Sequence, residues 1–313
     1  MPDVDALAAA VRRSGALNAK RQLRILRDRL PAVGDGDDGA LVPSGDGFLV
    51  LCGEAIAPAL VAADPHAAGA AAVVTNVADV RAMGGRPLGL IDMVVSPDAG
   101  HAERVLDGLA WAAGLLGVDV VGGHLTLGHP PAVAASCTGL ARRPLRASAA
   151  RPGDVLLAAF ALEGRYLGTT DFFSSLRERD AAALRDDGEA LVEVAERGLC
   201  RAARDVSMPG AGGSLLQLLE AAGCGAVLDL DRLARPPDVP AERWLMTFPS
   251  FGFLLAADPE AVPDACAVFS GRGLTCAPCG AFDDSRTLRL AAGGRTATVW
   301  DLAAEPLTGL ADG

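Results

Sequence analysis

The segment from Gly34 to Ala40 constrains this chain more than any other, because it combines sharp turns with concentrated negative charge. Its glycines let the backbone turn, and Asp35, Asp37 and Asp38 place three carboxylates within four residues. The whole chain contains a single lysine to neutralise them. An external cation is therefore expected, and a magnesium ion that also holds a phosphate fits oxygen ligands of this kind. A solvated acidic turn between a helix and a strand is the alternative that this segment alone leaves open.

Two other glycine-containing motifs must be considered for the same segment, and the sequence argues against both. The dinucleotide fingerprint G-x-G-x-x-G needs a strand before it and a helix after it. Here residues 26–33 have the pattern of a helix end broken by Pro31, and residues 40–43 that of a short strand. The aspartates would also repel a bare pyrophosphate. An EF-hand calcium loop needs glycine at its sixth position, which is Ala40 in this chain.

Composition excludes several classes of protein. A chain of 313 residues can form two cores, and we find no uninterrupted apolar run long enough to span a bilayer. The acidic start is unlike a signal peptide, so we expect a cytoplasmic protein with no membrane partner. A net charge of −11 disfavours nucleic acid as a partner. The only lysine, Lys20, is followed by Arg21, which excludes a Walker A loop and the strand lysine of protein kinases.

The hydrophobic pattern mixes helical and strand periods without regular alternation, which predicts an α+β protein of two domains. Within residues 1–30 it predicts two short helices with a break near Ser14, which we interpret as an arm or lid rather than as part of a core. Clustered Arg, Ser and Pro at residues 142–154 mark a boundary between domains at 31–145 and 150–305. Further strands are expected over residues 88–95, 118–121, 132–140, 155–160, 226–230 and 251–256, and further helices over 99–116, 181–197 and 214–222.

One predicted helix carries two polar residues on one face. Asp64 and Pro65 fit the N-cap and the first helical position, and the Ala-rich segment that follows continues until Gly84. Asn76 and Asp79 stand three residues apart on this helix and therefore share a face. In an otherwise apolar helix both need polar partners if they are buried, which favours a functional site.

A glycine pair and a histidine follow the strand expected over residues 118–121. Gly122 and Gly123 predict a turn, in which His124 could act as a base or orient a phosphate. A hydrogen-bonded turn residue without a function is the alternative for this histidine.

Seven cysteines are scattered through the chain, which favours reduced core thiols over a disulfide framework. Cys276 and Cys279 form a C-x-x-C pair. A zinc ribbon would need a second pair, and a redox dithiol would need a following helix, whereas residues 280–282 have the pattern of a strand end. We therefore favour a structural role for both cysteines.

Several of these segments together resemble the AIR synthase superfamily, which includes thiamine-monophosphate kinase, selenophosphate synthetase, the hydrogenase maturation dehydratase and formylglycinamidine-ribotide synthetase. The matching segments are residues 36–40, 69–87, 122–124 and 151–154, and Asn-x-x-Asp followed by Ala-Met-Gly-Gly-x-Pro is the most specific of them. Residues 204–207 and 244–253 look most like the AIR synthase-related branch, whose substrate is unknown.

The resemblance implies a PurM-like fold with an N-terminal domain that pairs with its counterpart in a homodimer to form a shared β-barrel, and a C-terminal α+β domain. It implies ATP near the dimer interface, with its phosphates held through Mg²⁺. The residues on matching positions are Asp37, Asp38 and Asp79 as metal ligands, Asn76, Gly84, Gly122, Gly123, Gly212 and Gly213 as cofactor-binding residues, and His124 and Asp205 as catalytic residues.

Superfamily members typically phosphorylate an oxygen of an amide or acid, so the resemblance implies an ATP-dependent enzyme that transfers a phosphoryl group to an oxygen of a small-molecule acceptor. His124 replaces an aspartate of the thiamine-monophosphate kinases and resembles selenophosphate synthetase there, and Gly53-Glu54 replaces a threonine-aspartate motif. A thiamine-monophosphate kinase is one alternative. A non-catalytic nucleotide-binding partner of other pathway enzymes is another.

Overall fold

The computed structural model describes residues 3–30, 33–34, 36–168 and 170–311. They form two compact units: unit 1 is made of Met1–Asp38, Leu145–Glu178 and Glu193–Gly313, and unit 2 of Gly39–Pro144 and Arg179–Val192. The units interleave along the chain, whereas the predicted domains are consecutive segments whose bounds stay predictions. Each unit combines helices with sheet, as the predicted α+β class requires.

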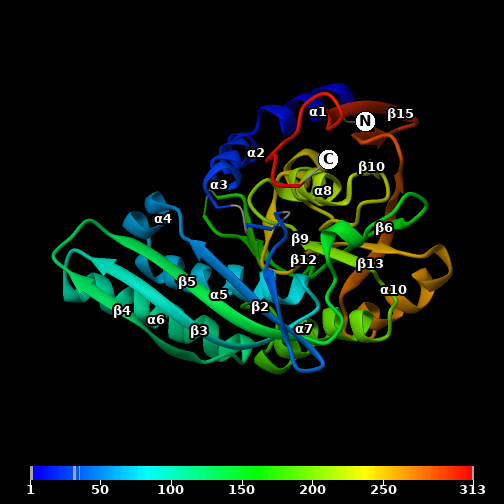
Figure 1. Cartoon of the computed structure of the whole chain (residues 1–313). Helices are drawn as coiled ribbons and strands as arrows, with labels where there is room; N and C mark the ends of the chain where they lie inside the picture. Colours follow the sequence, from blue (N-terminus) through cyan, green and yellow to red (C-terminus); the bar gives the residue numbers. More distant parts are fainter. Residues whose placement is uncertain (1–2, 31–32, 35, 169, 312–313) are drawn as a thin grey trace. The chain divides into compact units, whose positions relative to one another are not determined.

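A five-stranded sheet forms the centre of unit 2. Neighbouring strands are antiparallel, except that β3 and β4 are parallel. The sheet is open, and the described residues of this chain form no closed barrel. Figure 1 shows helices α5 and α6 on one side of it. In spatial order the strands are β1 (Ala40–Ser44), β2 (Gly47–Ala55), β5 (Ala132–Ala141), β3 (Arg86–Ser96) and β4 (Val120–Leu127), and the helices are α4 (Pro58–Ala63), α5 (Pro65–Ala82), α6 (Ala99–Leu116) and most of α7 (Ala181–Glu196).

Helix α5 starts and stops where the sequence predicts. The Asp64 carboxylate accepts a hydrogen bond from the N–H of Ala67 at 3.0 Å, and Pro65 occupies the first helical position. After the helix, Gly84 adopts a φ of +70°, which favours glycine and ends the helix.

Helices α5 and α6 pack with their backbones in direct contact. A Cβ atom added at Gly69 would lie 2.0 Å from the carbonyl oxygen of Val105, and one at Gly108 would lie 2.0 Å from that of His66. Glycine is therefore required at both positions, because any side chain would push the two helices apart. This close contact fixes the position of α5, the helix that carries Asn76.

The face of the sheet that α5 and α6 leave bare carries several apolar side chains. Leu51, Ile91, Met93 and Leu140 are between 39% and 47% exposed. His124 on β4 is paired in register with Met93 on β3, so both side chains lie on this bare face. The bare face is thus largely apolar, and the titratable side chain of His124 lies on it.

A seven-stranded sheet forms the centre of unit 1, and α8 buries nearly all of its length in the core of this unit. Helix α3 of the same unit, in contrast, has no buried residue. In spatial order the strands are β15 (Arg295–Asp301), β14 (Thr287–Ala292), β10 (Gly225–Asp229), β13 (Thr275–Asp283), β6 (Val155–Phe160), β12 (Gly252–Ala257) and β9 (Ala202–Asp205). A small second sheet contains β11 (Phe248–Pro249), β8 (Phe172–Ser174) and β7 (Arg165–Tyr166). The helices are α1 (Val4–Arg13), α2 (Gly15–Lys20), α3 (Arg24–Arg29), α8 (Gly210–Ala222), α9 (Ala241–Leu245) and α10 (Val262–Ser270), with 3₁₀ turns at Arg21–Leu23, Ala147–Ala149 and Pro259–Ala261.

The first two helices belong to the core of unit 1, so their interpretation as an arm or lid is wrong. Leu7 and Val11 of α1 and Leu17 of α2 are buried in the same apolar cluster as the sheet. The Arg12 guanidinium also donates hydrogen bonds to two carbonyls of β15. An amphipathic helix shows that it needs an apolar partner, but its sequence does not show that the partner lies almost 300 residues away.

None of the helices in the described part of the chain combines the length and the apolar character that crossing a bilayer requires.

Candidate functional site

The two aspartates of the acidic loop that the structure describes, Asp37 and Asp38, are fixed by hydrogen bonds within unit 1. The Asp37 carboxylate accepts from the N–H of Asp38 at 3.1 Å and from that of Ala147 at 2.9 Å. The Asp38 carboxylate accepts from the N–H of Asp205 at 3.0 Å, and its side chain is only 2% exposed. The alternative of a solvated acidic turn is therefore wrong for Asp38. Asp35 lies outside the described residues.

Arg204 is the residue that holds this loop, and no role was predicted for it. Its guanidinium forms an ion pair with Asp38 at 3.1 Å and donates to the Gly36 carbonyl at 3.0 Å and to Gln217 Oε1 at 3.3 Å. It is 5% exposed and lies in the buried strand β9 beside Asp205. Two adjacent opposite charges in an otherwise apolar strand were the signal that could have revealed it, because buried charges need partners.

The carboxylates of Asp38 and Asp205 lie close together, with one oxygen of each within 4.8 Å of the other. Burial raises the pKa of the Asp38 carboxyl, and the positive charge of Arg204 opposes this shift. Two neighbouring carboxylates repel each other when both are ionised, so a cation between them would be stabilising. Magnesium binds oxygens at about 2.0–2.1 Å in an octahedron, which places two ligands about 3–4 Å apart. The donor pair therefore fits a magnesium ion.

The polar pair on α5 lies in unit 2, and both side chains are buried as their shared face predicts. Asn76 is fully buried and donates to the Ala72 carbonyl at 2.8 Å, while its own carbonyl accepts from the Cys52 thiol at 3.3 Å. Asp79 is 7% exposed. Burial and the nearby charge of Asp79 raise the pKa of the Cys137 thiol to about 12. The roles predicted for Asn76 and Asp79 in cofactor and metal binding stay predictions.

Residues 122–124 do not form the turn that the sequence predicts, since β4 continues through them. Gly123 is required by its neighbour on β3, because a Cβ atom there would lie 2.1 Å from Oδ1 of Asp92. Sheet pairing thus overrides the weak strand preference of glycine. His124 is exposed on the edge strand, and its Nε2 lies 3.1 Å from Oγ1 of Thr126 on the same face. Roles for Gly122, Gly123 and His124 in catalysis or nucleotide binding stay predictions.

The glycines of α8 lie inside the helix rather than before it, because α8 starts at Gly210 and not at residue 214 as predicted. A Cβ atom at Gly212 would lie 3.2 Å from the Val11 side chain, and one at Gly213 would lie 2.2 Å from that of Pro209. Close packing within unit 1 therefore accounts for both glycines. Their predicted contact with phosphate, like that of Gly84 in unit 2, stays a prediction.

Cys276 and Cys279 lie within β13, which ends at Asp283, next to the strand end predicted at residues 280–282. Cys279 is fully buried. The thiol of Cys276 is hydrogen-bonded to that of Cys266 on α10. This hydrogen bond lowers the pKa of the Cys266 thiol to about 7. Cys266 is therefore the thiol in this pair that we expect to react.

Two domain models and a relative of similar length decide the family. The N-terminal domain model of AIR synthase related proteins matches residues 36–141, and the C-terminal domain model matches residues 152–292. An uncharacterized protein of Synechocystis sp. (strain ATCC 27184 / PCC 6803 / Kazusa) is 34% identical over 290 residues, which are 92% of this chain and 90% of that protein. This chain belongs to the AIR synthase related family.

Enzymes are found among the other members that the chain resembles. Selenide, water dikinase of Myxococcus xanthus is 30% identical over 217 residues, 66% of this chain and 61% of that protein. The structure of T. maritima PurL complexed with ADP matches 99% of this chain and 52% of its own, with a TM-score of 0.82 and 21% identity. The structure of AaThiL complexed with AMPPCP and TMP matches 92% of this chain and 99% of its own, with a TM-score of 0.70 and 18% identity. The fold is thus the two-domain PurM-like α+β fold. The chain spans about half the length of the PurL chain that it matches.

Proposed function

We propose that this protein transfers the γ-phosphoryl group of ATP to an oxygen of a small metabolite and requires magnesium. The observation that carries the proposal is the pair of buried carboxylates, Asp38 and Asp205, which are held close together in unit 1. Family membership supports ATP as the substrate, because the related proteins include a dikinase and structures complexed with ADP and AMPPCP.

In the proposed reaction an acceptor oxygen attacks the γ-phosphorus, the bond from that phosphorus to the β-phosphate oxygen breaks, and ADP leaves. Asp38 and Asp205 would hold the magnesium ion in unit 1, with Asp37 beside them, and Asp79 of unit 2 is the further ligand that the resemblance implies. When bound, magnesium supplies positive charge that neutralises phosphate oxygens. Arg204 keeps the Asp38 carboxylate in one orientation through the 3.1 Å ion pair. His124 is proposed to take the proton of the acceptor or to orient a phosphate.

We also propose that the protein is a homodimer in which the bare face of the unit 2 sheet meets the same face of a second copy. Single exposed apolar residues are ordinary on protein surfaces, but Leu51, Ile91, Met93 and Leu140 gather on one face of one open sheet. Contact between this face and the same face of a second copy would bury these apolar side chains in a symmetric interface. The family resemblance implies a shared barrel of this type.

The test of the activity is a titration of ATP, with and without magnesium, followed by a screen of acceptors for ADP release. Asp38→Asn should lose magnesium-dependent binding, whereas Asp46→Asn should bind as the wild type does, because Asp46 is an exposed residue in the turn between β1 and β2. Asp79→Asn tests the ligand that the resemblance implies. Wild-type protein that binds ATP equally well without magnesium, or an Asp38→Asn variant with full affinity, would contradict the proposal.

Two outcomes of the same screen would favour the alternatives. ADP release only with thiamine monophosphate would indicate a thiamine-monophosphate kinase. The structure of AaThiL, which this chain resembles in fold, contains AMPPCP and TMP. Tight magnesium-ATP binding without ADP release for any acceptor would indicate a non-catalytic partner of other pathway enzymes. Two departures from the kinase motifs motivate this second alternative: the exposed Glu54 on β2, and residues 207–209.

A further inference from the structure

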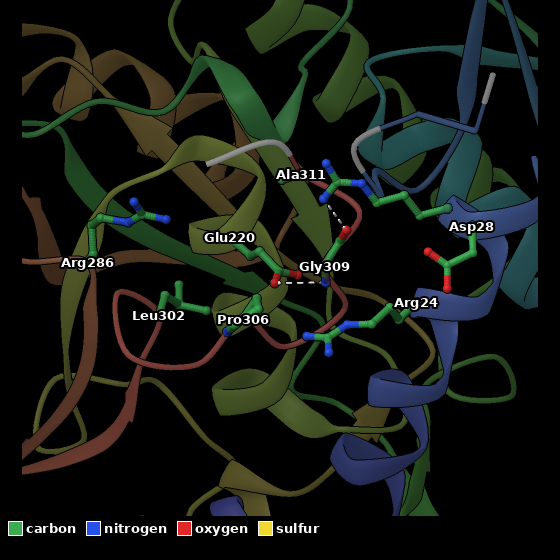
Figure 2. A pocket seen from close by; sticks show the side chains of 9 residues that line it. Arg24, Asp28, Glu220, Arg286, Leu302, Pro306, Gly309 and Ala311 are labelled. Carbon is green, nitrogen blue, oxygen red and sulfur yellow. Dashed lines mark hydrogen bonds between the residues drawn. The ribbon is translucent and has the colours of Figure 1, made fainter. Parts of the chain in front are cut away.

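Unit 1 contains a cavity of about 440 Å³ that none of the predicted site residues lines. Its walls come from α3, the end of α8, the loop between β13 and β14, and the chain that follows β15 (Figure 2). This volume falls within the range of about 300–1,000 Å³ that is usual for pockets that hold small molecules. The cavity is therefore large enough for a metabolite rather than for a single ion.

Three arginines line this cavity, although the chain as a whole is strongly acidic. Figure 2 shows the guanidinium groups of Arg24 and Arg286 directed from opposite sides toward the place where Glu220 meets Gly309. The third arginine, Arg27, donates to the Gly309 carbonyl at 2.8 Å and so fixes the chain that forms one wall.

The acidic residues in the cavity lining are Glu220 and Asp28. Both carboxylate oxygens of Glu220 accept hydrogen bonds from the N–H groups of Thr308 and Gly309, at 2.9 to 3.2 Å, and from the Thr308 hydroxyl. Glu220 therefore fastens the chain after β15. Asp28, the other acidic residue in the lining, is exposed on the surface of α3.

Arg286 has two features that packing alone does not explain. Its φ is +54°, which makes it the only non-glycine residue in the described part of the chain with a positive φ. Its Nε is buried and has no hydrogen-bond partner among the described residues. Left-handed backbone is unfavourable for an arginine, and a buried unpaired N–H of a cationic group is costly. Residues that keep such strain are concentrated at ligand sites.

We propose that this cavity binds a phosphate-bearing small molecule, with Arg24 and Arg286 as the groups that contact the phosphate. Guanidinium groups match phosphate oxygens through paired N–H donors and keep their charge at any physiological pH. A shift of the Arg286 side chain toward a bound ligand would let its buried Nε gain the acceptor that it lacks. The apolar side chains of Leu302 and Pro306 in the same wall suit the uncharged part of such a molecule.

The site is distinct from the proposed magnesium site and would bind without a metal. Asp38 does not line the cavity, and arginines rather than carboxylates provide its charge. The two sites share one connection within unit 1, because the backbone of Gly36 packs against the side chain of Leu310, which follows Gly309 in the chain.

The experiment is a calorimetric titration of inorganic phosphate and pyrophosphate into the full chain, in chelator and without magnesium, with citrate as a non-phosphate anion of similar charge. We expect pyrophosphate to bind, and Arg286→Gly and Arg24→Gln each to weaken it by about tenfold or more. Arg29→Gln, on the same helix but outside the cavity, should bind within about twofold of the wild type. Asp38→Asn should leave this affinity unchanged, which separates the result from that of the proposed function.

Thermal melting of the Arg286→Gly variant keeps the test independent of folding. Because glycine adopts a φ of +54° without strain, its melting temperature should equal or exceed that of the wild type. A large fall would show that Arg286 has a structural role and would overturn its assignment as a ligand residue. No binding of either phosphate probe at millimolar concentration, stronger binding of citrate than of pyrophosphate, or loss of binding in Asp38→Asn would each overturn the proposal.

Discussion

Replacing Asp38 by asparagine removes one charge from a buried network in which an attraction and a repulsion oppose each other. The ion pair with Arg204 at 3.1 Å is worth about 5 kcal/mol at an effective dielectric constant of about 20. The repulsion from Asp205, whose carboxylate lies within 4.8 Å, is worth about 3.5 kcal/mol or more on the same scale. The amide oxygen of asparagine can still accept the hydrogen bond from the N–H of Asp205. We therefore expect Asp38→Asn to lower the free energy of unfolding by about 2 kcal/mol or less when no metal is present.

Magnesium should increase the difference in the free energy of unfolding between the wild type and Asp38→Asn. A ligand that binds only the folded state stabilises it by about 2.7 kcal/mol at one hundred times its dissociation constant. Wild-type protein should gain this amount in urea unfolding with magnesium, while Asp38→Asn should gain almost none. Asp46→Asn, an exposed change of the same charge, serves as the control and should follow the wild type under both conditions.

The pH dependence has a defined sign. Burial raises the pKa of Asp38 in the folded state, so the folded protein binds its proton before the unfolded chain does as the pH falls. Without metal, acidification through the raised pKa should therefore stabilise the wild type relative to Asp38→Asn, and the stabilisation by magnesium should fade over the same range. A loss of about 3–5 kcal/mol in the variant without metal, typical of a buried ion pair that no second carboxylate opposes, would refute the reasoning, as would equal stabilisation of both proteins by magnesium.

Three further predictions follow from the structure. Gly69→Ala should destabilise the protein by about 1–3 kcal/mol or more in urea unfolding, because its Cβ meets the backbone of α6, whereas Gly114→Ala, with nothing within 4 Å, should stabilise it by up to about 1 kcal/mol. The labelling rate of Cys266 by a thiol reagent should rise through pH 7 and then level off, and Cys276→Ala should shift this rise to higher pH; a rise near pH 9 in the wild type would contradict the assigned hydrogen bond. Met93→Lys should convert the proposed homodimer into a monomer by light scattering, and a monomeric wild type would remove that proposal.

Local signals in the sequence predicted much of the fold. The Asp64-Pro65 start of α5 and the glycine after α6 act within one helical turn, and the structure places both where they were expected. Contacts distant in sequence override such signals. The glycine pair at residues 122–123 suggested a turn, yet it lies in a strand because β3 provides a partner and Asp92 leaves no space for a side chain.

The candidate site was predictable only in part for the same reason. Three carboxylates in a glycine-rich loop suggested a cation site, and burial of Asp38 is consistent with that interpretation. Arg204 could not be assigned to this loop from the sequence, because 166 residues separate it from Asp38. Nor could the sequence indicate that Glu220 fastens the chain around Thr308, since neither segment carries a recognisable motif.

The pairing of α1 with β15 has a consequence for the order in which the protein forms during synthesis. Arg12 of α1 bonds to the carbonyl of Val299, 287 residues later in the chain. At about 5–20 residues per second, a ribosome needs about 15–60 s to cover that distance, and the apolar face of α1 lacks this partner throughout. Residues 39–144 of unit 2 emerge long before then and can complete their sheet first. A ribosome stalled before β15 would thus carry a finished unit 2 and an unprotected α1, which makes the first helix a natural client for chaperones.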